Sequence, residues 1–191
     1  GKVTPVAECT NNEWTYSDKQ SILYSGQVVS ALSRLYAITN KTKYLDAAKL
    51  VAGHLIREVG LHGALVGDDY RPANSVSSSW IMMALIDLAK VDPTPVYKKT
   101  ILQIGDVLLE RQINQADDAY NHGRYLDAMT TSGNGWNNEV MGEMVPFCEQ
   151  QNLGNCDQYR DAVRKTSRWL LQLKRFSYEC YRKVFVRHHP V

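Results

Sequence analysis

The sequence repeats one pattern three times: apolar residues at helical spacing, a short polar break, and a second run at the same spacing. In the first unit, Val29, Leu32 and Tyr36 share one helical face. The later breaks contain Pro93 and Gly154, residue types that end helices. A helical hairpin cannot bury its apolar face alone, so neighbouring hairpins must stack. The pattern therefore predicts an all-α fold of three consecutive αα-hairpins, with helices over 18–38, 43–58, 75–91, 95–112, 136–151 and 156–173.

The two ends of the chain lack this repeat. We expect an irregular N-terminal segment over 1–16, a helical-hairpin domain over 17–174, and an irregular or extended tail over 175–191. Within the tail, residues 184–186 are typical of a short strand or an extended arm. Residues 17–20 have the spacing of a capping box, which predicts the start of the first helix. The chain starts without Met or an apolar signal sequence, so we expect a processed form or a fragment.

Long connections separate the predicted hairpins. They cover residues 60–74 and 112–135, whereas the breaks inside the hairpins are only about four residues long. Each long connection joins the second helix of one hairpin to the first helix of the next, so both lie at the same end of the stack. Long loops inside a compact domain are usually functional. We therefore expect the functional site at this end.

The first hairpin carries three further motifs. Ser-Gly-Gln at 25–27 opens a helix, and Ala-Leu-Ser-Arg-Leu-Tyr at 31–36 and Lys-Tyr-Leu-Asp-Ala-Ala at 43–48 follow. Together they resemble the hairpin units of the six-hairpin glycosidase superfamily and its α/α-toroid relatives, which include polysaccharide lyases, unsaturated-uronyl hydrolases and the C-terminal domain of glucuronyl C5-epimerases. The resemblance covers residues 17–174 as a repeat pattern. It implies part of an α/α toroid, because a complete toroid has six hairpins.

Two functions follow from this resemblance. The first is a carbohydrate-active domain that binds and processes a polysaccharide, including a uronate-containing one, by hydrolysis, lysis or epimerisation. The second is a non-catalytic helical-repeat module that binds glycan or protein within a larger assembly, because fold alone does not fix function. In both cases we expect partners beyond the ligand: further chains or the remainder of a toroid. An enzyme would bring at least two carboxyl, Tyr or His side chains to one point, whereas a scaffold would disperse them.

The first long connection contains two adjacent carboxylates, Asp68 and Asp69, followed by Tyr70 and Arg71. Carboxylates act as acid and base in glycoside hydrolysis, and arginine binds a uronate carboxylate through two hydrogen bonds. Asp69 is therefore a candidate catalytic residue, and Tyr70 and Arg71 are candidate substrate-binding residues. The alternative is a solvated turn in which an aspartate caps a helix and the arginine is exposed.

The second long connection and the helix after it are denser in polar and aromatic side chains. Aromatic rings stack on the apolar face of a pyranose, and planar polar groups bind its hydroxyls. The candidate catalytic residues are His122, Tyr125, Asp127 and Glu139, and the candidate substrate-binding residues are Arg124, Trp136, Asn137 and Asn138. A lyase or epimerase would use Tyr or His as the base, with Arg124 or an asparagine neutralising the carboxylate. The alternatives are that Trp136 packs in the core, that the asparagines cap a helix, and that Glu139 is a first-turn charge.

Charge and hydropathy exclude other classes of function. Lys plus Arg number 22 and Asp plus Glu number 20, so the formal charge of +2 is too small to indicate a nucleic-acid partner. Apolar runs are interrupted every few residues, so we expect no membrane span. No Cys or His spacing is typical of zinc and no phosphate-binding loop is present, so we expect neither a metal nor a cofactor.

The four cysteines suggest one disulfide. Cys148 and Cys156 flank the predicted turn of the third hairpin, where antiparallel helices bring such positions within bonding distance. Cys9 and Cys180 would then pair with each other or with another chain. The alternative is four reduced thiols. With the disulfide, we expect a secreted or periplasmic protein.

Overall fold

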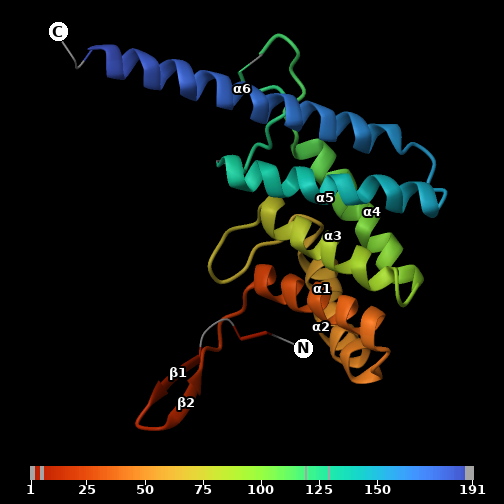
Figure 1. The fold of residues 1–191 in the computed structure, drawn as a ribbon. Helices are drawn as coiled ribbons and strands as arrows, with labels where there is room; N and C mark the ends of the chain where they lie inside the picture. The colour runs from red at the N-terminus through yellow and green to blue at the C-terminus, as the bar shows by residue number, and fades with distance from the viewer. Residues whose placement is uncertain (1–2, 5–6, 119, 129, 188–191) are drawn as a thin grey trace.

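The computed structural model describes residues 3–4, 7–118, 120–128 and 130–187, and only the backbone of residues 173–187. Its elements are β1 (Ala7–Thr10), β2 (Glu13–Tyr16), α1 (Ile22–Thr39), α2 (Thr42–His62), α3 (Ser75–Ala89), α4 (Pro95–Arg111), α5 (Thr131–Gln150) and α6 (Asp157–Arg187) (Figure 1). The predicted all-α class is confirmed, and the helices follow one another as three hairpins. The place of these hairpins in a larger toroid stays a prediction.

Side chains just before the first helix of each hairpin determine where that helix begins. Ser21, Asn74 and Thr130 accept hydrogen bonds from backbone N–H groups of the following first turn, which otherwise lack partners. Because of these caps, α1 begins after Ser21 rather than at the predicted capping box over 17–20. For the same reason α5 begins at Thr131 rather than at residue 136.

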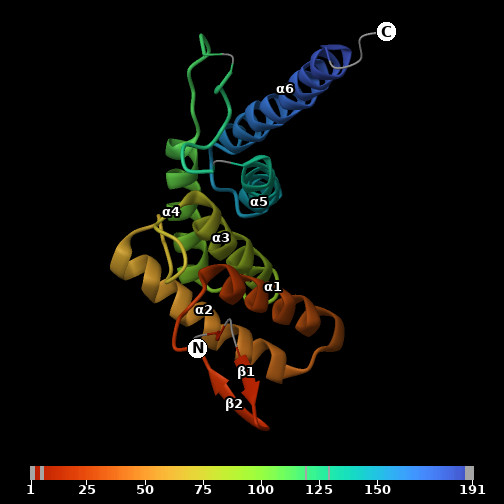
Figure 2. The ribbon, with the colours of Figure 1, turned by 90° about the vertical axis from the view of Figure 1, so that its left-hand side faces the viewer.

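The helices form two layers with α3 at the centre. The first helices of the three hairpins, α1, α3 and α5, lie side by side, and each packs against the second helix of its own hairpin (Figures 1 and 2). Every side chain from Ile81 to Leu88 in α3 is buried. This helix therefore contributes the middle of the core, and it fixes the positions of α1 and α5 on either side.

The two ends of the chain differ from the predictions. Residues 7–16 of the N-terminal segment are not irregular: β1 and β2 form an antiparallel hairpin, whose turn residues Asn11 and Asn12 both have positive φ. The prediction of an irregular or extended tail is wrong as far as Arg187, because α6 continues to that residue. Apolar residues recur there at spacings of three or four, which favours a helix: Leu173, Phe176, Cys180 and Val184. Residues 188–191 lie outside the described chain.

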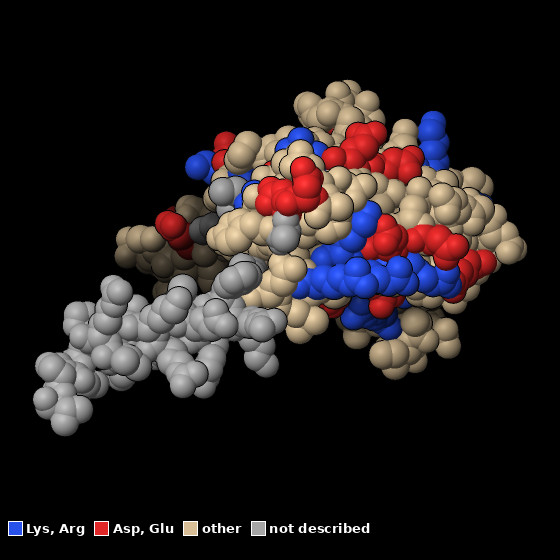
Figure 3. All heavy atoms as spheres, turned by 90° about the horizontal axis from the view of Figure 1, so that it is seen from above, with Lys and Arg blue, Asp and Glu red and all other residues tan. Residues whose placement is uncertain are grey.

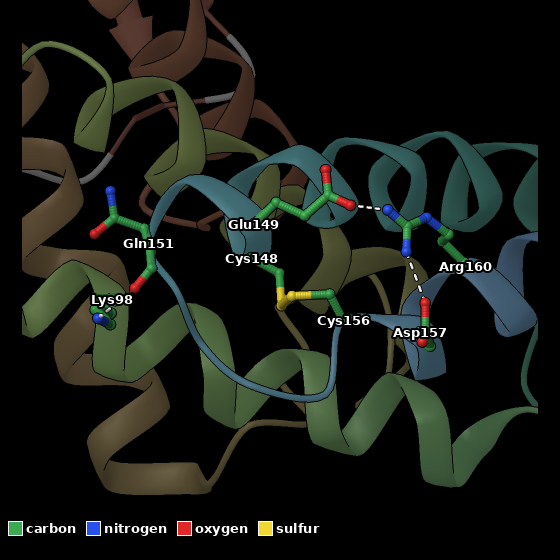
Figure 4. The surroundings of a disulfide bond; sticks show 7 residues. All are labelled: Lys98, Cys148, Glu149, Gln151, Cys156, Asp157 and Arg160. Carbon is green, nitrogen blue, oxygen red and sulfur yellow. Dashed lines mark hydrogen bonds and ion pairs between the residues drawn. A yellow bond between two sulfur atoms is a disulfide. The ribbon is translucent and has the colours of Figure 1, made fainter.

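The predicted disulfide is present between Cys148, near the end of α5, and Cys156, just before α6. Their Cα atoms are 5.7 Å apart, and the bond closes a loop of sequence separation 8 (Figure 4). Beside it, Arg160 forms ion pairs with Glu149 and Asp157. Cys9 is a free, exposed thiol, and the side chain of Cys180 lies outside the described residues, so their predicted pairing is untested. A disulfide is compatible with an extracellular location.

None of the helices in the described chain is both long enough and apolar enough to cross a membrane.

Candidate functional site

A cavity of about 510 Å³ lies where the first helices of the hairpins begin. Its lining comes from the starts of α1, α3 and α5 and from both long connections: Leu23, Arg71, Pro72, Asn74, Val76, Trp80, Asp127, Ala128, Thr130, Ser132, Gly133 and Trp136. These three helix starts lie on the same side of the molecule (Figure 1). The two long connections therefore share one cavity at one end of the stack, as the sequence predicted. We call it the tryptophan pocket.

Two tryptophans form one wall of the tryptophan pocket. Trp80 from α3 and Trp136 from α5 stack with ring centroids 3.7 Å apart and planes 17° apart. Both side chains are half-buried, and Trp136 Nε1 is buried without a hydrogen-bond partner among the described residues. One face of each indole ring packs against the other ring. Both rings also line the tryptophan pocket, so the stacked pair presents an aromatic surface to it.

Asp127 is the acidic side chain of the tryptophan pocket. Its Oδ2 accepts a hydrogen bond from the backbone N–H of Ser75 at 2.9 Å and lies 3.4 Å from Arg111 Nε. The start of α3 favours a negative charge at this position. Asp127 Oδ1 is buried and has no partner within the described chain. Oδ2 of this carboxylate thus stabilises the fold, whereas Oδ1 has no hydrogen-bond partner in the described chain.

The carboxylates of the first long connection hold that connection against the start of α1. Asp68 Oδ2 accepts from the backbone N–H of Ile22 at 2.9 Å, and Asp69 Oδ2 accepts from that of Gln20 at 2.7 Å. Asp69 lines a neighbouring cavity of about 440 Å³ rather than the tryptophan pocket. The two candidate catalytic residues Asp69 and Asp127 therefore do not share a pocket, because the hydrogen bond to Gln20 N–H, just before α1, holds Asp69 beside the neighbouring cavity. Arg71 borders both cavities.

Three other candidates of the second long connection lie away from the tryptophan pocket. His122 and Arg124 are half-buried inside the connection and contribute nothing to the pocket lining, contrary to the prediction. Tyr125 is completely buried, and this burial raises the pKa of its phenol, which favours the protonated form. A buried, protonated phenol cannot reach a ligand as a base, so the structure argues against the predicted catalytic role of Tyr125.

The two candidate asparagines of α5 bind neighbouring helices. Asn137 accepts a hydrogen bond from Ser79 Oγ at 2.9 Å and donates one to Ser75 Oγ at 2.7 Å. Asn138 donates to Ser167 Oγ of α6 at 3.0 Å. Neither asparagine caps a helix and neither lines the tryptophan pocket. Their side chains fix α5 between α3 and α6.

The remaining two candidates are exposed side chains outside the pocket lining. Glu139 lies on α5, one turn beyond Trp136. Tyr70 is 47% exposed, and the Lys19 ammonium lies 5.7 Å from its ring centroid. Of all the predicted site residues, Arg71, Asp127 and Trp136 are thus the ones that meet in one pocket.

The second long connection is fixed against α6. Gln112 Nε2 donates to Ala162 O and Thr166 Oγ1, both at 2.8 Å, and Thr166 Oγ1 donates to Gly123 O at 2.7 Å. Gly123 has φ +94° and lies so close to α6 that a Cβ there would be 2.4 Å from Lys165 O. This part of the second long connection is therefore a packed segment rather than a loose loop.

The sequence alone does not mark Trp80 and Arg111 as residues of the site. Trp80 falls on the apolar stripe of its helix, which is typical of a core residue. One signal could have found it: Trp80 and Trp136 each lie six residues after the cap of their helix, Asn74 and Thr130. Equivalent positions of a repeat lie at the same end of the stack. No comparable signal marks Arg111.

Other kinds of site find little support. The described residues contain no cluster of His, Cys, Asp and Glu that could hold a metal ion. Lys and Arg form a band over α6, with Asp and Glu beside it (Figure 3). Arg164 and Lys165 of this helix both pair with Asp161. Hydrogen bonding to Lys165 is the main cause that lowers the pKa of Asp161. This band is an ion-paired surface and does not point to a nucleic-acid partner.

Comparison with known proteins adds no assignment. No protein-family model, curated protein or solved structure matches this chain.

Proposed function

We propose that this chain binds a carbohydrate in the tryptophan pocket. The stacked pair Trp80–Trp136, which lines a cavity of about 510 Å³, carries the proposal. Pyranose rings bind to aromatic faces through their C–H surfaces, while planar polar groups bind the hydroxyls. Arg71 is exposed, lines the same pocket and offers donors for a uronate carboxylate.

The arrangement of titratable groups favours binding over processing. Asp127 is the one Asp, Glu, His or Tyr among the described residues that line the pocket. Glycoside hydrolysis with two carboxyl groups requires a second one within about 5–9.5 Å across the scissile bond. Asp69 binds the backbone N–H of Gln20, just before α1, and lies beside a different cavity. A non-catalytic glycan-binding module of a secreted or periplasmic assembly is therefore our leading assignment.

Processing of the glycan is the second candidate, and Asp127 is the observation that favours it. Its Oδ1 has no hydrogen-bond partner in the part of the chain that the structure describes. This oxygen is buried, so it would act as an acid or base only after a movement that exposes it to the bound substrate. Hydrolysis, lysis and epimerisation would each need a further group, from a ligand-induced movement or from another chain.

The test is a titration of the chain with neutral and uronate-containing oligosaccharides. Tryptophan fluorescence and calorimetry measure the binding. We expect saturable binding that changes the fluorescence. Replacing Arg71 with Ala should weaken a uronate ligand by about 1.5–3 kcal/mol, the range for hydrogen bonds to charged groups, and a neutral ligand much less. The matched control is Arg57→Ala, an exposed arginine of α2 outside the pocket lining.

Mass spectrometry of the same mixtures separates the two candidates. Unchanged oligosaccharides together with saturable binding support a binding module. A cleavage product or a mass shift that disappears in Asp127→Asn supports processing. If no member of the panel binds, carbohydrate recognition by this pocket is refuted.

A further inference from the structure

The turn between α1 and α2 contains an acceptor motif for N-glycosylation. Asn40-Lys41-Thr42 matches the pattern Asn-x-Ser/Thr, in which x is any residue except proline. No other asparagine of the sequence is followed two positions later by Ser or Thr. The motif is only three residues long, so its surroundings in the fold decide whether it can serve as a modification site.

The structure places this motif in an open turn. Asn40 follows the last residue of α1, and Thr42 is the first residue of α2. Every residue from 37 to 43 is exposed, and Ile38 is 81% exposed. The turn lies at the edge of the molecule (Figure 2). The folded chain therefore has room for a bulky, hydrated glycan at this position.

The side chain of Asn40 takes no part in holding the fold together. Its backbone N–H ends α1 by donating to Tyr36 O at 2.8 Å, with a φ of +52°. Within the described chain, no hydrogen bond involves the side chains of Asn40 and Thr42. The amides of Asn74 and Asn137, by contrast, bind residues of α3. The Asn40 amide can therefore be modified without the loss of a structural contact.

The disulfide between Cys148 and Cys156 is an independent indication of the same compartment. Disulfides form and persist in the oxidising lumen of the secretory pathway. Oligosaccharides are added to Asn-x-Ser/Thr motifs in secreted proteins, on surface loops. The motif, its exposed turn and the disulfide therefore agree.

We propose that Asn40 is an N-glycosylation site, which receives an oligosaccharide in the secretory pathway. The donor is an oligosaccharide that is linked to a lipid through a diphosphate. Nδ2 of Asn40 forms a bond to C1 of the first sugar, and the bond between C1 and the diphosphate oxygen breaks. The lipid diphosphate leaves with the electron pair of that bond, and the amide nitrogen loses one proton.

The attached glycan lies far from the tryptophan pocket. α1 starts beside that pocket, where Leu23 contributes to the lining, and Asn40 follows the other end of the helix. At 1.5 Å per residue, the 18 residues of α1 span about 27 Å. Glycosylation of Asn40 therefore leaves the pocket open and does not depend on what the pocket binds.

The test is expression of the full chain, with an added signal sequence, in a eukaryotic cell, followed by intact-mass and peptide mass spectrometry. The chain should carry the mass of an oligosaccharide, which peptide-N-glycosidase removes, leaving an aspartate at position 40. Asn40→Gly and Thr42→Ala should each abolish the added mass, whereas Thr42→Ser should keep it. Glycine adopts a positive φ without strain, so Asn40→Gly preserves the end of α1.

Asn152 is a matched control within the same chain. It is exposed, has a φ of +50° and lies in the turn of the third hairpin, but Gly154 occupies the position where the motif requires Ser or Thr. We expect Asn152 to stay unmodified. An unmodified mass of both the secreted and the cell-associated wild-type chain overturns the proposal. An added mass that persists in Asn40→Gly overturns it too, because the sugar is then attached elsewhere.

Discussion

The carboxylate of Asp127 accepts a hydrogen bond from the backbone N–H of Ser75 at 2.9 Å, across a sequence separation of 52 residues. Ser75 is the first residue of α3, so the second long connection caps the central helix of the fold. The same carboxylate lines the tryptophan pocket. A structural role and a ligand-binding role therefore meet in one side chain, and experiments on Asp127 must separate them.

Two substitutions at Asp127 separate these roles. Asp127→Ala removes the acceptor of the Ser75 N–H and leaves Arg111 without its carboxylate, so the free energy of unfolding should fall by about 1–3 kcal/mol. Asp127→Asn keeps an acceptor oxygen and should cost less stability, while any catalytic turnover should be lost. Urea denaturation measures the first effect, with the exposed Asp117→Ala as control. Equal stability of Asp127→Ala and wild type would contradict the capping role.

The tryptophan stack should show coupling in ligand binding. Trp80→Ala and Trp136→Ala should each weaken the bound oligosaccharide, because each removes part of one aromatic platform. The double variant should lose less than the sum of the two, with a coupling of about 0.5–1.5 kcal/mol. Calorimetric titration of the four proteins gives this value, and Tyr120→Ala, an exposed residue of the same connection, is the control. Strictly additive losses would mean that the rings act separately.

Gly123 should tolerate no side chain. A Cβ at this position would lie 2.4 Å from Lys165 O, at a φ of +94° that side-chain-bearing residues rarely adopt. We expect Gly123→Ala to lower the free energy of unfolding by more than about 1–3 kcal/mol, the range for backbone strain alone. The matched control is Gly142→Ala in α5, where a Cβ meets open space. That change should stabilise the helix by about 0.5–1 kcal/mol, and thermal denaturation compares the two.

Asp92 should make stability depend on acid pH. Partial burial raises the pKa of Asp92, but hydrogen bonds to Lys49, Thr94 and Tyr97 outweigh it, and the pKa lies below its ordinary value of 3.8. A lowered pKa in the folded state contributes stability that is present above the unfolded value and is lost as pH falls through the folded one. Asp92→Asn should therefore cost about 1 kcal/mol at neutral pH, and this cost should vanish at an acid pH below the lowered pKa of Asp92 in the folded state. A cost that is the same at both pH values would refute this account.

The disulfide should be detectable by mass and by stability. Alkylation of the native chain without reductant should leave Cys148 and Cys156 unmodified and should label the exposed Cys9. For so short a loop, chain entropy predicts that Cys148→Ser with Cys156→Ser costs about 2.5 kcal/mol. Cys9→Ser is the control and should leave stability unchanged. Labelling of all four cysteines would exclude the bond and weaken the case for an exported protein.

Local patterns were sufficient to predict the hairpins, the disulfide and the end of the stack that holds the pocket. Each depends on residues close in sequence: the apolar spacing of the helices, the short turn between Cys148 and Cys156, and the order in which helices and connections alternate. The side-chain assignments were less successful because they depend on distant partners. Asp68, for example, caps an N–H that lies 46 residues away in sequence.

Burial explains the other misassigned residues. A polar or aromatic residue in a long connection is equally compatible with a ligand site and with packing against another element. Tyr125 is buried because the second long connection packs on α6, and that packing involves Gln112, Gly123 and Thr166. Trp80 is the opposite case, because it lies on an apolar stripe and yet lines the pocket. An apolar stripe does not show which of its helical turns faces a cavity. Both distinctions arise only when the helices are assembled.

The central position of α3 affects how this protein unfolds. In a linear repeat array each unit contacts only its neighbours, and the array frays from its ends. Here α3 packs against α1, α4 and α5, and all of its side chains from Ile81 to Leu88 are buried. Opening any one hairpin exposes this apolar helix. We therefore expect the backbone amides of 81–88 to exchange with solvent only through global unfolding, so that the three hairpins behave as one cooperative unit.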